Sequence, residues 1–94
     1  TCALPIYVTS TTGTSITHIN TVAAGGAHTS GLADGSNGQI KIITMIADGG
    51  NSVITPSNFA NGSTITFADV NDTVTLIFTN GKWTLLANVG ATIA

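Results

Sequence analysis

The sequence predicts an all-β fold, either a small antiparallel β-sandwich or a jelly-roll-like barrel with a C-terminal hairpin. Thr, Val and Ile dominate the ordered segments, and side chains branched at Cβ fit a pleated sheet better than a helix. Turn signals recur along the chain, and their Asn and Gly residues accept the positive φ that tight hairpins need. Short strands divided by such turns are typical of sandwiches and barrels. The turn signals are Asp34-Gly35, Asn37-Gly38, Asp48-Gly49-Gly50, Asn61-Gly62 and Asn80-Gly81.

The C-terminal hairpin is the element that the sequence determines best. A two-residue turn at Asn80-Gly81 places most apolar residues of both strands on one face, so register and hydrophobic pattern agree. Ile77 and Leu86 remain on the other face, which indicates that this face is partly covered as well. The predicted facing pairs are Thr79 with Lys82, Phe78 with Trp83, Leu76 with Leu85, and Val74 with Ala87.

Two shorter strands precede the hairpin. Ser63 to Phe67 alternates polar and apolar residues, which directs Ile65 and Phe67 into the same core. Asn51 to Thr55 is a strand that ends at Pro56, because proline cannot donate to a ladder. The predicted core residues are Val74, Leu76, Phe78, Trp83, Leu85, Ile65 and Phe67.

The segment Gln39 to Ala47 is apolar on both faces. A strand buried on both sides belongs at the centre of a sheet or at a subunit interface. We therefore take Ile43 and Met45 as candidate interface residues.

The first third of the chain has a different character. Residues 1–13 are predicted to form an extended arm with one edge strand, Ile6–Val8, and residues 14–94 the β-domain. Arms of this kind pack on neighbouring subunits, which makes Ile6, Tyr7 and Val8 candidate interface residues; a frayed terminus is the alternative. Ser15 to Val22 alternates only weakly, and Ala23 to Gly31 is small, polar and rich in glycine, without a strand signal.

Charge is scarce in this sequence. Charged residues make up 6% of the chain and give a net charge of −2, whereas an average domain contains roughly 25%. Free monomers usually stay soluble through mixed surface charges. The composition therefore predicts a homo-oligomer or a subunit of a larger particle. A Thr-rich secreted domain that is soluble through its hydroxyl groups is the alternative.

Nucleic acid and membrane are both poor partners for this chain. Two lysines and no arginine cannot neutralise a run of phosphates. The longest apolar stretch, Ile40 to Ala47, is far shorter than the roughly 18 residues of a membrane-spanning helix.

Enzyme motifs are absent from the sequence, which has no phosphate-binding glycine loop, no Gly-x-Ser-x-Gly and no Cys-x-x-Cys. His18 and His28 lack a metal-ligand spacing, so we expect no catalytic residue, no metal ligand and no cofactor. The aspartates are expected to cap turns, with calcium binding as the alternative. Trp83 is expected in the core, with sugar stacking as the alternative, for which Tyr7 is a second candidate. Cys2 is expected to be an inert thiol, with a link to a neighbouring chain or a lipid anchor as the alternatives.

Seven short motifs follow one another between Leu32 and Trp83. They are Leu32-Ala33-Asp34-Gly35, Gly38-Gln39-Ile40-Lys41, Ala47-Asp48-Gly49-Gly50, Val53-x-Thr55-Pro56, Thr64-Ile65-Thr66-Phe67, Asp72-Thr73-Val74-Thr75-Leu76-x-Phe78 and Gly81-Lys82-Trp83. In this order they resemble a β-rich module of structural proteins from tailed phages and other large DNA viruses of aquatic hosts. The module occurs in small virion proteins and at the ends of longer fibre-like ones. The resemblance covers residues 32–94 and does not extend to residues 1–31.

This resemblance implies a structural role in a virion, outside the cell, without catalysis. The leading hypothesis is a capsid decoration or cement protein that associates with itself, with a trimer favoured, and with virion proteins such as the major capsid protein. The second hypothesis is a receptor- or glycan-binding tip of a tail or head fibre. The third is a subunit of a cellular surface filament.

Overall fold

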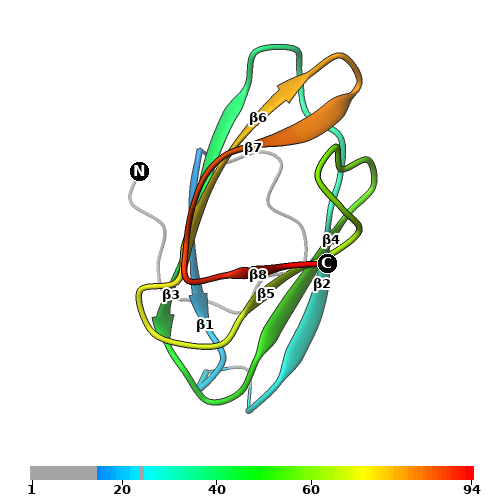
Figure 1. Ribbon diagram of the computed structural model, residues 1–94. Helices are drawn as coiled ribbons and strands as arrows, with labels where there is room; N and C mark the ends of the chain where they lie inside the picture. Colours follow the sequence, from blue (N-terminus) through cyan, green and yellow to red (C-terminus); the bar gives the residue numbers. More distant parts are fainter. Residues whose placement is uncertain (1–14, 24) are drawn as a thin grey trace.

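The computed structural model describes residues 15–94, with the exception of residue 24 (Figure 1). The predicted arm, residues 1–13, lies outside these residues, and with it the strand Ile6–Val8 and the candidate interface residues Ile6, Tyr7 and Val8. The described strands are β1 (Ile16–Asn20), β2 (His28–Leu32), β3 (Ile40–Ala47), β4 (Ser52–Pro56), β5 (Ile65–Phe67), β6 (Thr73–Thr79), β7 (Lys82–Val89) and β8 (Thr92–Ile93).

The strands form two four-stranded sheets that face each other (Figure 1). Sheet A has the order β1-β3-β6-β7, and sheet B has the order β2-β4-β5-β8. The prediction of an all-β sandwich is thereby confirmed. The described part of the chain contains no helix that is long and apolar enough to cross a membrane.

The sheets are mixed, and in this detail the prediction of antiparallel strands was wrong. β1 pairs with β3 in parallel, and β2 pairs with β4 in parallel. Parallel neighbours need a crossover connection, and here the chain supplies it by alternating between the sheets. Along the sequence, β2 of sheet B comes between β1 and β3 of sheet A, and β3 of sheet A comes between β2 and β4 of sheet B. The sequence analysis missed β2 because His28–Leu32 overlaps a segment of small residues that resembles a loop.

The β6–β7 hairpin has the predicted turn. Asn80 and Gly81 have φ values of 55° and 76°, the left-handed geometry that a two-residue hairpin turn requires. The register Phe78↔Trp83 and Leu76↔Leu85 is as predicted.

Farther from the turn, the predicted register of the same hairpin was wrong. Val74 pairs with Asn88 instead of Ala87, because the register shifts between Thr75 and Leu76. Leu86 is the extra residue of this bulge, which moves exposed Ala87 away from the core face.

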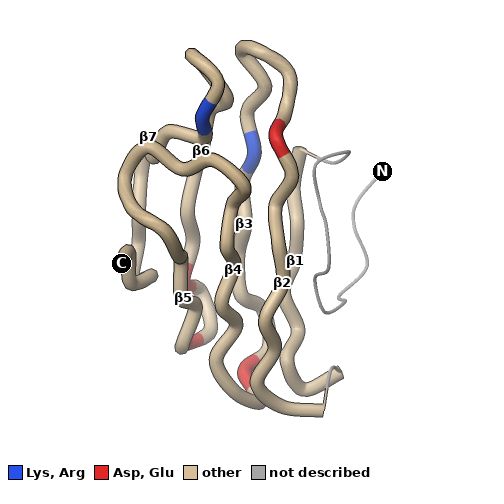
Figure 2. Tube along the Cα trace, turned by 90° about the vertical axis from the view of Figure 1, so that its right-hand side faces the viewer, with Lys and Arg blue, Asp and Glu red and all other residues tan. Residues whose placement is uncertain are grey.

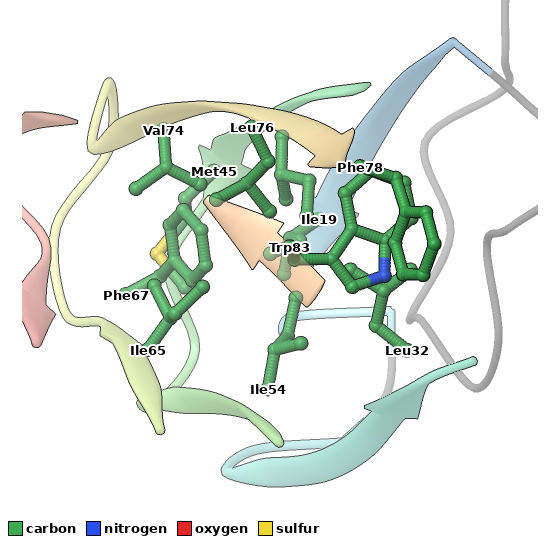
Figure 3. Close-up of a cluster of buried hydrophobic side chains, with 11 residues drawn as sticks. Ile19, Leu32, Met45, Ile54, Ile65, Phe67, Val74, Leu76, Phe78 and Trp83 are labelled. Atoms are coloured by element: carbon green, nitrogen blue, oxygen red, sulfur yellow. The ribbon is translucent and has the colours of Figure 1, made fainter. Parts of the chain in front are cut away.

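The core lies between the two sheets, and Figure 3 shows its side chains. Six of the seven predicted core residues are buried, and the seventh, Leu85, packs against them half-buried. Phe78 and Trp83 meet edge to face, with ring centroids 5.2 Å apart, as cross-strand neighbours. The buried apolar residues are Ile19, Leu32, Ile43, Met45, Ile54, Ile65, Phe67, Val74, Leu76, Phe78 and Trp83.

Ile43 and Met45 require a correction, because the sequence placed them at an interface. Both side chains are 0% exposed and belong to the core. On β3, alternate residues point inward, so these two share the inner face with Lys41. The other isoleucines of the strand, Ile40, Ile42 and Ile46, lie on the outer face.

The edge of sheet A at β7 is covered for part of its length by the segment after β4. The Trp83 amide donates to the Asn58 carbonyl at 2.9 Å, and the Ala60 amide donates to the Trp83 carbonyl at 2.8 Å. The Asn61 side chain continues this contact by accepting a 2.9 Å hydrogen bond from the Leu85 amide. Covered backbone of this kind protects an edge strand from pairing with another chain.

Candidate interaction surface

Charged side chains lie near the two ends of the sandwich. The aspartates occupy the segments between strands, and Lys82 begins β7 directly after the hairpin turn. Figure 2 shows the corresponding blue and red segments close to the strand ends, with the long middle of each sheet free of them. Because the few charges lie at the ends, the two broad faces carry almost none.

The outer face of sheet A carries isoleucine and threonine in register across its four strands. Thr44 and Thr73 are linked on it, because the Thr73 hydroxyl donates to the Thr44 hydroxyl at 3.2 Å. Among the described residues, Lys82 at the end of the hairpin is the only Lys, Arg, Asp or Glu on this face. The cross-strand rows are Ile40-Ile77-Thr84, Ile16-Ile42-Thr75-Ala87 and His18-Thr44-Thr73-Val89.

Several apolar side chains of this face are open to solvent. Ile16 is 49% exposed, Ile40 is 48% exposed and Val89 is 65% exposed. Leu86, displaced by the bulge, is 55% exposed. The hairpin pattern in the sequence predicted part of this surface, because it places Ile77 and Leu86 outside the core on a face expected to be partly covered.

The outer face of sheet B is also uncharged, but it is less apolar. Its main row is Thr29-Val53-Thr66-Thr92, and Gly31 pairs with Thr55 beside it. Val53 is half-buried, whereas Thr29, Thr55 and Thr92 are exposed. Hydroxyl groups can remain hydrated on such a surface, so the apolar side chains of sheet A have the stronger reason to be covered.

Lys41 is a charged residue that lies inside the core, and its burial was not predicted from the sequence. It is 0% exposed, and its Nζ donates a 2.6 Å hydrogen bond to the Thr17 hydroxyl on the inner face of β1. Burial lowers its pKa from 10.5 to about 8, because the charged form loses its hydration. The side-chain alternation of β3 was the sequence feature that could have predicted this burial, because Lys41 is in phase with Ile43 and Met45.

Three aspartates, Asp34, Asp48 and Asp72, make side-chain hydrogen bonds within or between loops, and Asp48 and Asp72 cap turns as predicted. Asp72 accepts hydrogen bonds from the amides of Ala68 and Asp69, both at 3.0 Å. Asp48 accepts one from the Gly50 amide at 3.1 Å. Asp34 instead accepts from the Asn58 side chain through both carboxylate oxygens, each at 2.9 Å.

The histidines lie on different sheets. His18 is on β1 of sheet A, and His28 begins β2 of sheet B. Across residues 15–94 without 24, no group of three or more His, Cys, Asp or Glu side chains is close enough to hold a metal ion.

Trp83 lies where a sugar cannot stack on it. Its ring is 0% exposed, and its indole N–H donates to the Ala33 carbonyl at 3.0 Å. A Cβ atom on Gly35 would meet the Trp83 ring at 2.9 Å, so the loop after β2 closes over the indole. Sugar stacking on Trp83 was therefore a wrong alternative, and packing in the core is its role.

Comparison with models of known protein families finds no match, and comparison with curated proteins finds no significant relative. The function is therefore inferred from the surface described above and from the sequence resemblance.

Proposed function

We propose that this chain is a non-catalytic structural subunit that associates with copies of itself and with the surface of a larger particle. The observation that carries the proposal is the outer face of sheet A, which spans four strands and carries one charged side chain, Lys82, among the described residues. Exposed apolar patches of this kind mark interaction sites in soluble proteins.

The particle we propose is a virion, and the role is that of a capsid decoration or cement protein. The resemblance of residues 32–94 to structural modules of tailed phages supports this choice, and the major capsid protein is then a partner. Decoration requires many copies that bind weakly, because repeated contacts raise the effective concentration. An uncharged sheet face suits such a contact, since it does not depend on salt.

The role of a glycan-binding fibre tip receives less support. Carbohydrate sites commonly use an exposed aromatic ring next to polar loops, whereas among the described residues Phe67, Phe78 and Trp83 are buried. Tyr7 lies outside the described residues. Phe59 is half-buried and packs against the core.

Electron microscopy with gold-labelled antibodies against this chain tests the proposed role. Label spread over the particle shell is expected for a decoration protein. Label confined to fibre or tail tips would contradict the decoration role, and label on cell-surface filaments would contradict the virion assignment.

A further inference from the structure

We propose that the outer face of sheet A packs against the same face of a second copy of this chain, related by a two-fold axis. This inference rests on the proposed structural role and names the surface and the partner. Its basis is the combination of exposed apolar side chains, missing charge and sufficient area on one regular sheet.

The charge pattern of this face permits contact with the same face of a second copy. A two-fold contact places each surface against its own copy, so every charge meets a like charge if it lies near the axis. Lys82 pairs with Thr79 at the end of the hairpin, away from the central row of Ile42 and Thr75. With the axis in the plane of the contact, through its centre and along the strands, each lysine lies roughly 7 Å to the side of the axis. Across a sheet spacing of about 10 Å the two lysines are then roughly 17 Å apart, beyond the Debye length of about 8 Å.

The area of the face is adequate for a weak, specific contact. Four strands at about 4.8 Å spacing, with about seven residues each at about 3.3 Å rise, give a face on the order of 450 Å². Two such faces bury on the order of 900 Å², above most crystal contacts and below the roughly 1,200–2,000 Å² of stable complexes. We expect a dissociation constant on the order of 10–100 µM, strengthened when many copies assemble.

The shape of the sheet also favours a second copy. Two sheets with the same twist pack face to face with their strands within about 30° of each other. The isoleucines and threonines of the central row then interdigitate, as the inner faces of a sandwich do. Sheet B is the weaker candidate because Val53 is its main apolar residue on the outside.

The trimer expected from the resemblance is a competing arrangement. A three-fold ring joins two different surfaces of each copy, whereas face-to-face packing joins one surface to itself. The stoichiometry in solution therefore decides between them.

Sedimentation velocity of the full chain from about 5 to 500 µM measures the association, because this range brackets the expected dissociation constant. Thr75→Lys puts a charge near the axis, opposite its own copy, and is expected to weaken the dimer at least about tenfold. Thr66→Lys is the matched control, since Thr66 is also a half-buried threonine on the third strand of its sheet. It is expected to leave the dissociation constant within about twofold, a change below about 0.4 kcal/mol.

Circular dichroism shows whether Thr75→Lys folds. If it does not fold, a second pair of variants tests the same contact. Ala87→Lys charges the exposed partner of Thr75 on β7, and Thr92→Lys charges the exposed partner of Thr66 on β8. Loss of the dimer in the sheet A variants alone supports the proposal.

Four results overturn the proposed contact: a 9.4 kDa monomer throughout the range, a trimer, loss of association only in the sheet B variants, or equal loss in both sets. The proposed virion role is tested independently of this contact, because its test is the position of the gold label on the particle.

Discussion

Replacing the buried lysine tests how much the charge inside this small core costs. Lys41 is 0% exposed and its pKa is lowered from 10.5 to about 8 by burial. One pKa unit corresponds to about 1.36 kcal/mol, so keeping the lysine charged in the folded state costs about 3 kcal/mol at neutral pH. A domain of this kind has roughly 5–15 kcal/mol of stability in total.

The sign of the pH dependence follows from proton binding. Below about pH 8 the lysine is protonated in both states, so it adds no slope to the free energy of unfolding. Between about 8 and 10.5 the unfolded chain binds more protons than the folded one, and the stability rises with pH. The full gain of about 3 kcal/mol is reached above pH 10.5.

Lys41→Met keeps most of the side-chain volume and removes the charge. The variant is expected to be more stable than the parent at pH 7 by about 1–3 kcal/mol, because apolar replacements of buried charges are often stabilising. The advantage should shrink toward zero as the pH rises past about 10, since the parent lysine is then neutral as well.

Urea unfolding from pH 7 to 10.5 measures this difference at one fixed protein concentration, because self-association also changes apparent stability. The sequence has a single tryptophan, Trp83, whose buried ring reports the loss of the core by fluorescence. Lys82→Met is the matched control, because it removes the same charge from an exposed position. A stability difference between parent and Lys41→Met that stays constant over this pH range would refute the reasoning.

Three further predictions concern packing and hydrogen bonds. Trp83→Ala removes the largest buried side chain and should cost about 3–5 kcal/mol in denaturant unfolding; a parent-like melt would mean that the ring is not in the core. Thr21→Val should cost about 1–3 kcal/mol, because the Thr21 hydroxyl accepts from the Gly49 amide at 2.7 Å and donates to the Gly50 carbonyl at 2.8 Å. Thr21→Ser keeps both bonds and is the control, so equal losses in the two variants would argue against this role. Ser52→Ala should be neutral or stabilising by about 1 kcal/mol, since the buried hydroxyl has no hydrogen-bond partner among the described residues; a clear loss of stability would show that the hydroxyl is satisfied.

Local information in the sequence was sufficient for the hairpin turn and for most of the core. Asn80-Gly81 demands a left-handed two-residue turn, and this turn pairs Phe78 with Trp83 and Leu76 with Leu85. Side-chain alternation then directed Ile65 and Phe67 inward. These features depend on residues that are close in the chain, so pattern and propensity determine them together.

The bulge at Leu86 and the strand β2 lay beyond this kind of inference. The register shift that pairs Val74 with Asn88 falls at Leu85-Leu86-Ala87, where no Gly or Pro marks it in the sequence. The strand β2 has weak propensity of its own and is held by parallel pairing with β4. Tertiary pairing supplied the stabilisation that intrinsic β propensity did not.

The sequence by itself determined an all-β chain with little charge and a C-terminal hairpin. Only the tertiary structure decided which face of β3 is the core and which remains outside. Both faces of that strand carry large apolar side chains, so hydrophobic pattern alone cannot distinguish them. The position of sheet B decided it, because it covers Ile43 and Met45 and leaves Ile40 and Ile42 on the outer face of sheet A.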